Sequence, residues 1–438
     1  MPRWSYTLLL RLLLPAVLLW QLCRGWRNCA NQVDLSKRLG WKLPHRNDRP
    51  VWIHAASVGE VQAAATLLRR LRSQDCARPL LLTTGTATGL LRARLLFADL
   101  LAAPSGAVPA LSLMIAPFDL PGAARRFLHA TRPRAAILVE TELWPNLIAA
   151  AASAAVPLAL VSARVSARST GRYLKFAPHL LQQTLRCFRC IAAQGAADAQ
   201  RFVQLGADPQ RVQIAGNLKF DFDLPKDIVP RAATVRARIA AARGLWVAGS
   251  THPGEESECL GAQHELRQRA RSAGMAAPLC VLAPRHPDRF DAVARWLQEQ
   301  GATFVRQSSG QTVGVDTDVL LLDSLGELLV LYAAADAAFV GGSLVPVGGH
   351  NLLEPAALGK PVLTGPHAFN SPEAAQLLES ADALQRVSDA HSLAQALWEV
   401  LAGAGDAAQA RGARAAVAVA ANRGATDRAL ALLAPMLS

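Results

Sequence analysis

Short apolar runs alternate with longer, helix-like segments over most of the chain, and polar or glycine-containing turns separate them. In the first half these runs read VWIHAA, LLLTT, ALSLMIAP, AAILVE, PLALVSA, CIAAQ and VQIAG. Strands that helices cover on both faces are continuous apolar runs of this length. The pattern therefore predicts an α/β fold built on a doubly wound parallel sheet.

The alternation begins again after the segment LPKDIVP at 224–230, whose prolines and polar middle are typical of an interdomain connection. A chain of 438 residues also exceeds what one hydrophobic core usually supports. We therefore expect two domains of the same architecture, at residues 31–225 and 226–438, with a cleft between them. The Ala/Arg-rich stretch 392–437 is expected to be helical and to pack across both domains.

A hydrophobic segment, TLLLRLLLPAVLLWQL, stands near the N-terminus and is interrupted by Arg11 and Pro15. It is shorter than the roughly 20 apolar residues that span a bilayer comfortably. A cleaved signal peptide, a short signal anchor and an amphipathic segment in the membrane interface are the three interpretations. No A-x-A cleavage site follows. Basic residues and interfacial tryptophans flank the segment instead, namely Trp4, Trp20, Arg24, Trp26, Arg27, Lys37 and Arg38. These features favour an uncleaved membrane anchor at residues 1–30, with the globular part on the cytoplasmic side.

The formal net charge of +13 suits nucleic acid, an anionic membrane surface or a phosphorylated substrate. Nucleic acid is the weakest of these, because only 5% of residues are aromatic and no RNP-like or zinc-finger pattern occurs. Seven cysteines at irregular spacing indicate a reducing compartment rather than a disulfide framework. Cys187 and Cys190 form a lone CxxC, which we interpret as ordinary thiols rather than a zinc or redox site.

Several charged residues follow the strands of the first predicted domain, where ligands bind in a parallel sheet. Glu60 follows VWIHA, with Ser57 as a helix cap and Gly59 in the turn; Glu140 and Glu142 follow AAILV, and Lys219 follows VQIAG. Two of them have a simpler alternative, in which Glu60 only complements a helix dipole and Lys219 only pairs with Asp221. A carboxylate that ends an apolar strand must, however, be solvated in a cleft or paired. Together these residues indicate a shared cleft, and Arg164, Arg168 and Arg172 add either a basic rim or a solvated face.

The stretch GGSLVPVGGHNLLEPAALGKPVLTGPH at 341–367 is the strongest ligand-binding signal of the second predicted domain. Its glycines allow close approach of the backbone to a ligand, and a helix start near Asn351 would face a phosphate, with Glu354 accepting hydrogen bonds from a ribose. Arg285 and His286 follow another predicted strand, where the forked N–H donors of the arginine suit phosphate oxygens. The pairs Asp221/Asp223 and Asp316/Asp318 have metal-binding spacing, but their positions do not favour a metal site.

Ten ordered segments resemble the Kdo transferase family of lipopolysaccharide inner-core assembly. They are HAASVGEV, TTGTATG, ETELWPN, SARVSARSTGRY, GNLKFD, AGSTHPGEE, APRHPDRF, DSLGEL, FVGGSLVPVGGHNLLEPA and GPHAFN. The resemblance covers essentially the whole chain. It implies the GT-B fold, with two Rossmann-like domains and the donor bound mainly by the second. It also implies transfer of 3-deoxy-D-manno-octulosonic acid (Kdo) from CMP-Kdo to a lipid A precursor (lipid IVA) at the cytoplasmic face of the bacterial inner membrane, without a metal or other cofactor.

The resemblance also assigns roles to single residues. Glu60 in ASVGE matches the proposed general base, and Glu140 and Lys219 match residues thought to steady the transition state. The family's CMP-binding positions correspond to Pro284, Arg285, Leu325, Gly326, Glu327, Asn351, Leu352, Leu353 and Glu354. The chain departs from the family pattern at Ser162, where Asn is usual, and at Ser371, where an aromatic residue often stands.

An inverting transfer agrees with this residue chemistry. Glu60 would accept the proton of the attacking hydroxyl, while Arg285, Lys219 and the helix start at Asn351 would stabilise the leaving phosphate. Two other classes stay open. One is a different GT-B enzyme, such as a UDP-sugar transferase or a sugar-nucleotide epimerase, and the other is a catalytically silent, membrane-bound nucleotide-binding protein.

Overall fold

The computed structural model describes residues 1–27, 34–102, 110–240, 242–403 and 405–437. They form two compact units, one comprising Met1–Asp223 with Asn422–Ser438 and the other Leu224–Ala421. The chain first passes from one unit to the other between Asp223 and Leu224, close to the expected boundary after residue 225. The other expected boundary, between residues 30 and 31, lies outside the described residues.

The first unit is built on a parallel sheet. Its seven described strands have the order β3-β2-β1-β4-β5-β6-β7. They are β1 (Val51–His54), β2 (Leu80–Thr84), β3 (Leu111–Ile115), β4 (Ala135–Val139), β5 (Leu158–Ala163), β6 (Phe188–Ala193) and β7 (Val212–Ile214). The winding reverses between β1 and β4, and in open α/β sheets ligands bind at the carboxyl ends of the strands at such a switch point. The predicted doubly wound parallel sheet is thus confirmed.

Helices cover both faces of this sheet, because successive side chains of a strand point to opposite faces. Val51 and Ile53 of β1 pack in one cluster with α3 and α19, and Trp52 packs in the other with α6 and α7. The helices are α1 (Arg3–Arg27), α2 (Leu35–Arg38), α3 (Val58–Gln74), α4 (Ala87–Leu96), α5 (Ala98–Leu101), α6 (Pro121–Thr131), α7 (Pro145–Ser153), α8 (Ala167–Phe176), α9 (Pro178–Leu185), α10 (Ala196–Gln204) and α19 (Ala425–Leu437), with short 3-10 turns η2 (Pro209–Arg211) and η3 (Leu218–Phe220).

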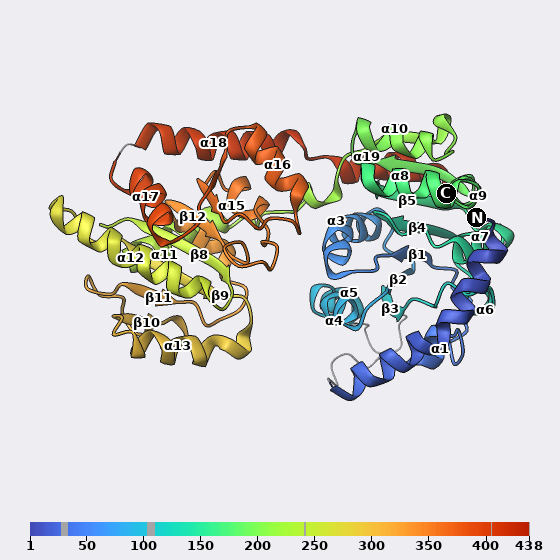
Figure 1. The fold of residues 1–438 in the computed structure, drawn as a ribbon, viewed down its shortest axis with the longest axis horizontal. Coiled ribbons are helices and arrows are strands. Elements are labelled where there is room, and N and C mark those ends of the chain that lie inside the picture. The colour runs from blue at the N-terminus through green and yellow to red at the C-terminus, as the bar shows by residue number, and fades with distance from the viewer. Residues whose placement is uncertain (28–33, 103–109, 241, 404, 438) are drawn as a thin grey trace. The chain divides into compact units, whose positions relative to one another are not determined.

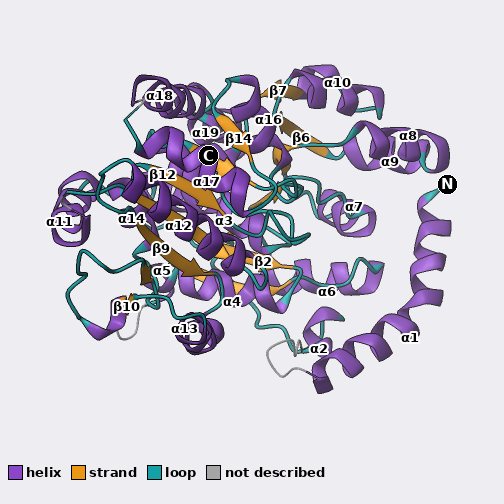
Figure 2. Ribbon diagram, turned by 60° about the vertical axis from the view of Figure 1, so that its left-hand side comes forward, coloured by secondary structure: helices purple, strands orange, loops and turns teal. Residues whose placement is uncertain are grey.

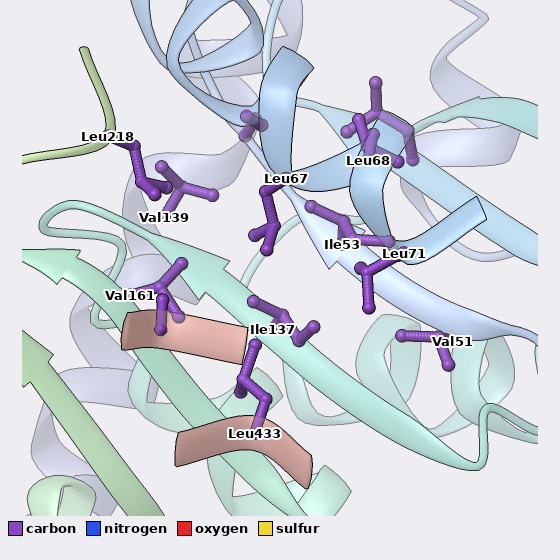
Figure 3. Close-up of a cluster of buried hydrophobic side chains, with 14 of the residues drawn as sticks. Val51, Ile53, Leu67, Leu68, Leu71, Ile137, Val139, Val161, Leu218 and Leu433 are labelled. Atoms are coloured by element: carbon purple, nitrogen blue, oxygen red, sulfur yellow. The ribbon is translucent and has the colours of Figure 1, made fainter. Parts of the chain in front are cut away.

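The last helix corrects the expected extent of the second domain. Residues 422–438 belong to the first unit, where α19 lies beside α3 and β5 (Figure 1). Figure 3 shows Leu433 of α19 pointing toward Ile137 of β4. The cause is packing: Ala425, Ala429 and Leu433 are buried and complete the core on one face of the first sheet.

The second unit repeats the architecture. Its described strands have the order β10-β11-β9-β8-β12-β13-β14 and are all parallel, with the switch point between β8 and β12. The strands are β8 (Leu245–Thr251), β9 (Leu279–Pro284), β10 (Phe304–Arg306), β11 (Val319–Leu321), β12 (Ala337–Val340), β13 (Val362–Thr364) and β14 (Leu384–Arg386). The helices are α11 (Ile228–Ala240), α12 (Glu255–Ser272), α13 (Phe290–Glu299), α14 (Leu328–Ala334), α15 (Leu353–Ala357), α16 (Pro372–Ser380), α17 (Ala390–Leu401) and α18 (Gly405–Ala421), with turns η4 (Pro287–Arg289) and η5 (Gln307–Ser309).

The hydrophobic N-terminal segment forms α1, which runs along the outside of the first unit past α7 and α6 (Figure 2). Two hydrogen bonds attach its first turns to the unit: Tyr6 donates to Asp119 at 2.9 Å, and Thr7 donates to Asn146 at 3.0 Å. Within the described part of the chain, no helix combines the length and the apolar character needed to cross a bilayer.

Asp221 holds the returning C-terminal segment, since its carboxylate accepts the backbone N–H groups of Gly424 and Thr426. Asp221→Ala leaves both groups at the start of α19 without this acceptor. We expect the free energy of unfolding in urea to fall by about 1–2 kcal/mol, the usual cost of losing a helix cap. The matched control is the exposed Asp223→Ala, which we expect to stay within about 0.5 kcal/mol. Equal effects of the two changes would contradict this assignment.

Candidate functional site

Glu60 lies beyond the carboxyl end of β1, at the switch point of the first sheet. Ser57 caps α3 by accepting the N–H of Glu60, and Glu60 reaches back so that one carboxylate oxygen accepts the N–H of Ala56 at 2.7 Å. Its other oxygen accepts the hydroxyl of Ser57 at 2.7 Å. The S-x-x-E spacing in SVGE is that of a capping box, but Glu60 accepts the N–H of Ala56, one residue before the N-cap, instead of that of Ser57. The reciprocal bonds fix the carboxylate in one orientation.

The environment of Glu60 favours its protonated form. The residue is 8% exposed. Burial raises the pKa of Glu60 and the nearby Glu142 carboxylate raises it further, although the hydrogen bonds from Ser57 and Ala56 oppose the shift. A carboxylate with a raised pKa is a stronger base, which suits proton removal from a hydroxyl.

Glu140 and Lys219 form an ion pair, with 2.6 Å between Nζ and Oε1. Glu140 follows β4 directly and has a φ of 62°, a left-handed conformation that costs a non-glycine residue about 1–3 kcal/mol. Strain of this kind concentrates at functional sites, where the surrounding structure enforces it. The simpler alternative, a pair of Lys219 with Asp221, does not hold, because Lys219 pairs with Glu140 and Asp221 holds the start of α19.

Ser162 positions the segment that carries Lys219. Its hydroxyl oxygen accepts the N–H of Leu218 at 3.3 Å and the side-chain amide of Gln194 at 3.2 Å. Asn217 in turn accepts the N–H of Lys219 at 2.9 Å and caps η3. The serine at this departure from the family pattern thus makes structural contacts, which the sequence did not reveal.

Glu142 is held beside the same group of residues. The indole of Trp144 donates to its carboxylate at 2.6 Å, and Nε2 of the fully buried His54 lies 3.7 Å from it. The first unit therefore places Glu60, Glu140, Glu142 and Lys219 near the ends of β1 and β4, as the strand-end argument predicted. Arg168 and Arg172 lie on α8 with exposed side chains.

In the second unit, Glu255 organises the glycine-rich stretch that follows β12. This residue begins α12 and is fully buried. Its carboxylate accepts four backbone N–H groups, from His252 at 2.9 Å, Gly342 at 2.6 Å, Ser343 at 2.9 Å and Leu344 at 2.9 Å. A buried carboxylate requires such compensation, because an unpaired charge in the interior is costly. Glu255 lies in the motif AGSTHPGEE, whose spacing alone predicted no role for it.

Two glycines allow this approach. A Cβ on Gly341 would lie 2.7 Å from the carbonyl oxygen of Ser250, and one on Gly342 would lie 2.9 Å from the ring of His350. Gly342 also has a φ of 72°, which favours glycine. The stretch after β12 is consequently fixed by the backbone itself, and a side chain at either position would displace it.

The predicted donor-binding residues occupy strand ends and turns of this unit. Pro284 ends β9, Arg285 follows it with an exposed side chain, and its N–H donates to Thr251 at 3.0 Å. Leu325 is 75% exposed in the turn before α14, where Gly326 has a φ of 89° and Glu327 accepts the hydroxyl of Ser324 at 2.8 Å.

A helix does start near Asn351, as expected, but it is short. It is α15, which begins at Leu353 and has only five residues, with Leu352 as its N-cap residue. The Asn351 side chain accepts the N–H of Leu353 at 3.1 Å and donates to Glu354 at 3.0 Å. A single turn of helix adds little dipole, so the donors available to a phosphate here are side chains and loop N–H groups rather than a long helix.

His252 and His350 are the residues that sequence reasoning missed. Their Nε2 atoms lie 2.8 Å apart, and their rings are nearly parallel, with 5.0 Å between centroids. His252 follows β8 and His350 precedes Asn351, so both lie by the switch point of the second sheet. The only sequence signal for these histidines was that they lie in the motifs AGSTHP and GGHN. Their contact could not be predicted, because it joins residues far apart in sequence that only the fold brings together.

The other candidates have structural explanations. In the described residues, Cys187 and Cys190 are free thiols, and burial raises the pKa of Cys190 to about 11, so it is an unreactive thiol. Asp318 accepts from Arg267 at 2.5 Å. No group of three or more His, Cys, Asp or Glu side chains in the described chain is arranged to hold a metal ion.

Comparison with known proteins gives consistent matches. A family model described as 3-deoxy-D-manno-octulosonic-acid transferase (kdotransferase) matches residues 33–222. The 3-deoxy-D-manno-octulosonic acid transferase of Haemophilus influenzae is 35% identical over 99% of both chains, and that of Bordetella pertussis is 40% identical over 98% of both. A crystal structure of a glycosyltransferase from Rickettsia africae covers 90% of this chain and all of its own, at 11% identity and a TM-score of 0.55. That likeness concerns the fold alone and agrees with the two parallel-sheet α/β domains of the GT-B class.

Glu255→Gln tests whether the buried carboxylate holds the stretch after β12. The amide keeps one acceptor oxygen, but its NH2 group faces N–H donors. We expect the free energy of unfolding in urea to fall by about 2–5 kcal/mol, the range for leaving buried polar groups unpaired. The control is Glu399→Gln, an exposed position on α17. A change as small as that of the control would refute the role of Glu255.

Proposed function

This chain belongs to the 3-deoxy-D-manno-octulosonic acid (Kdo) transferase family, and we propose that it moves Kdo from CMP-Kdo to a lipid A precursor, lipid IVA. Glu60 is the general base, the anomeric carbon is inverted, and no metal takes part. Family membership makes the chain a glycosyltransferase of lipopolysaccharide biosynthesis. The identity of the acceptor and the roles of single residues go beyond family membership and are part of this proposal.

The observation that carries the mechanism is the orientation of Glu60. Its oxygens each accept one hydrogen bond, from Ser57 and Ala56, and an ionised carboxylate has further acceptor sites for an incoming proton. In the reaction, the acceptor hydroxyl oxygen attacks the anomeric carbon of Kdo, and its proton passes to Glu60. Such help from a general base typically contributes about 100-fold to 10,000-fold in rate.

The bond between the anomeric carbon and the phosphate oxygen of CMP breaks in the same step, and its electron pair stays on the phosphate. CMP thereby gains a negative charge, which preorganised donors stabilise. Arg285 suits this task because its guanidinium presents forked N–H donors to phosphate oxygens. Lys219 and Glu140 contribute a fixed ion pair in the first unit, which steadies charge near Glu60.

The test is transfer of Kdo to a tetraacylated lipid A precursor by the full chain, with CMP-Kdo supplied, EDTA present and product mass as the readout. We expect mass gains of whole Kdo units. Glu60→Gln should lower turnover about 100-fold or more while CMP binding persists. Turnover of the native chain should fall as the pH drops through the raised pKa of Glu60, above the ordinary value of about 4.3, because a protonated carboxyl cannot accept the proton.

Glu373→Gln, on α16 of the second unit, is the matched control and should keep its turnover. Turnover of Glu60→Gln at the native rate would remove Glu60 from the base role. If the native chain transfers no Kdo while a uridine diphosphate sugar shifts its melting temperature on binding, that result would favour a different GT-B enzyme.

We also propose that α1 attaches the protein to the cytoplasmic face of the bacterial inner membrane. Its side chains Tyr6, Leu10 and Leu14 are partly buried against the first unit, whereas a stripe on another face is exposed. That stripe comprises Trp4 at 71% exposure, Leu8 at 51%, Leu12 at 70% and Leu19 at 64%. An apolar helix face that the protein leaves uncovered fits insertion into the headgroup region, where the net positive charge adds attraction to anionic lipids.

Substituting the exposed stripe should therefore release the protein from lipid. We expect the change of Leu8, Leu12 and Leu19 to Gln to weaken co-flotation with anionic vesicles at least about tenfold, because each buried leucine contributes roughly 1.5–3 kcal/mol. Val229→Gln with Val315→Gln, two exposed positions of the second unit, serves as the control. Undiminished flotation of the triple variant would rule out the stripe as the attachment.

A further inference from the structure

The histidines at the switch point of the second sheet form a connected group. His252 and His350 share a hydrogen bond of 2.8 Å between their Nε2 atoms. His286, which follows β9, stands edge-on to His252 with 5.4 Å between centroids. The carboxyl ends of three adjacent strands, β9, β8 and β12, therefore bring imidazoles together at the place where open α/β sheets bind ligands.

The hydrogen bond restricts the protons of the pair. An Nε2–H of one ring must donate to an unprotonated Nε2 of the other, so the accepting ring carries its proton on Nδ1. The neutral pair thus holds two protons on four ring nitrogens. Of the two unprotonated nitrogens, one is the Nε2 that accepts the hydrogen bond, and the other, the Nδ1 of the donating ring, is left to take up a proton. One more proton would give the pair a full positive charge that both rings share through the hydrogen bond.

The surroundings hold the pair neutral when no anion is bound. Burial, followed by the charge of Arg285 and the other two imidazoles, lowers the pKa of His350 to about 4. Burial also lowers the pKa of His252, with His286 and Arg289 acting in the same direction.

The acidic groups near the pair are already engaged. Glu255 and Glu256 raise the pKa of His252. Glu255, however, accepts four backbone N–H groups, and Glu256 accepts from Arg289 at 2.8 Å and from Thr251 at 3.1 Å. Arg289 is thus paired with Glu256, while Arg285 and the imidazoles face no carboxylate that is free of other partners among these groups. Such a group is suited to an anionic ligand.

We propose that His252 and His350 bind the phosphate of the cytidine nucleotide as a pair, and that the pair takes up one proton from solvent when the phosphate dianion binds. This proposal rests on the function proposed above. The bond cleaved in the transfer leaves CMP with a second negative charge, and a proton on the histidine pair balances it while CMP is bound. Arg285 carries its charge permanently, whereas the pair becomes charged only when the anion arrives.

Neighbouring residues hold the pair in place. Gly342 leaves room for the ring of His350, since a Cβ there would lie 3.0 Å from its Nε2 atom. Glu255 accepts the N–H groups of both His252 and Gly342, so one buried carboxylate fixes the backbone beneath both rings. The distance between the two Nε2 atoms is therefore set by the fold rather than by the ligand.

The experiment is calorimetric titration of the full chain with CMP, repeated in buffers of different ionisation enthalpy at about pH 6.5, near the ordinary titration of histidine. The dependence of the binding enthalpy on the buffer gives the number of protons taken up. We expect net uptake by the native chain, and an affinity for CMP that falls as pH rises, because binding that takes up a proton weakens when protons are scarce.

His350→Asn and His252→Asn keep a polar side chain but cannot be protonated in this range. Each should abolish the uptake beyond that of the nucleotide's own phosphate and weaken CMP binding about 10-fold to 100-fold, the loss expected for a charge-assisted hydrogen bond. Cytidine, which lacks the phosphate, should bind the native chain and both variants alike. Its binding also reports whether a variant is folded. His264→Asn, an exposed position on α12, is the matched control and should behave as the native chain.

The outcomes separate this proposal from the function on which it rests. Binding of CMP by the native chain without uptake beyond that of the phosphate would overturn the role of the pair and leave the proposed function standing. Native uptake that persists in both asparagine variants would also overturn it. If the native chain binds neither CMP nor cytidine, the proposed donor is wrong, and the proposal fails with it.

Discussion

The parallel direction of the strands is the constraint on which the candidate site residues of both units depend. In each sheet all carboxyl ends meet at one edge, and winding in two directions from a central strand opens a switch point there. Residues far apart in sequence are thereby collected. In the first unit Glu60 follows β1 and Glu140 follows β4, while in the second His252 follows β8 and His350 follows β12. The order and direction of the strands thus bring the candidate functional residues of each unit to the same edge of its sheet.

Each switch point also carries buried charge that the backbone or a partner neutralises. Glu255 accepts four N–H groups, Glu60 accepts hydrogen bonds from Ala56 and Ser57, and Glu140 pairs with Lys219 in a strained conformation. Such arrangements are costly to build, yet they fix polar groups in one orientation before a substrate arrives. Preorganisation of this kind is what electrostatic catalysis requires, because the groups then need not reorganise during the reaction.

Much of the architecture could be predicted because apolar runs have the length and continuity that parallel strands demand. The strand-end positions of Glu60, Glu140 and Arg285 followed from the same pattern. The simpler alternative of a Lys219–Asp221 pair does not hold, because Lys219 contacts Glu140, and local spacing gave no indication of that contact. The assignment of residues 422–438 to the second domain failed for a similar reason: an amphipathic helix shows its apolar face but not which sheet that face will cover.

The sequence by itself determined the fold class, the repeat of the architecture, the family and the residues that follow each strand, because these depend on local patterns and ordered motifs. Only the tertiary structure decided which of those residues touch. Glu255 beneath the glycines, Ser162 behind Lys219 and His252 against His350 are contacts between segments separated by dozens of residues. Their distances depend on strand order and on the close approach that Gly341 and Gly342 permit, and neither is encoded in the spacing of any one motif.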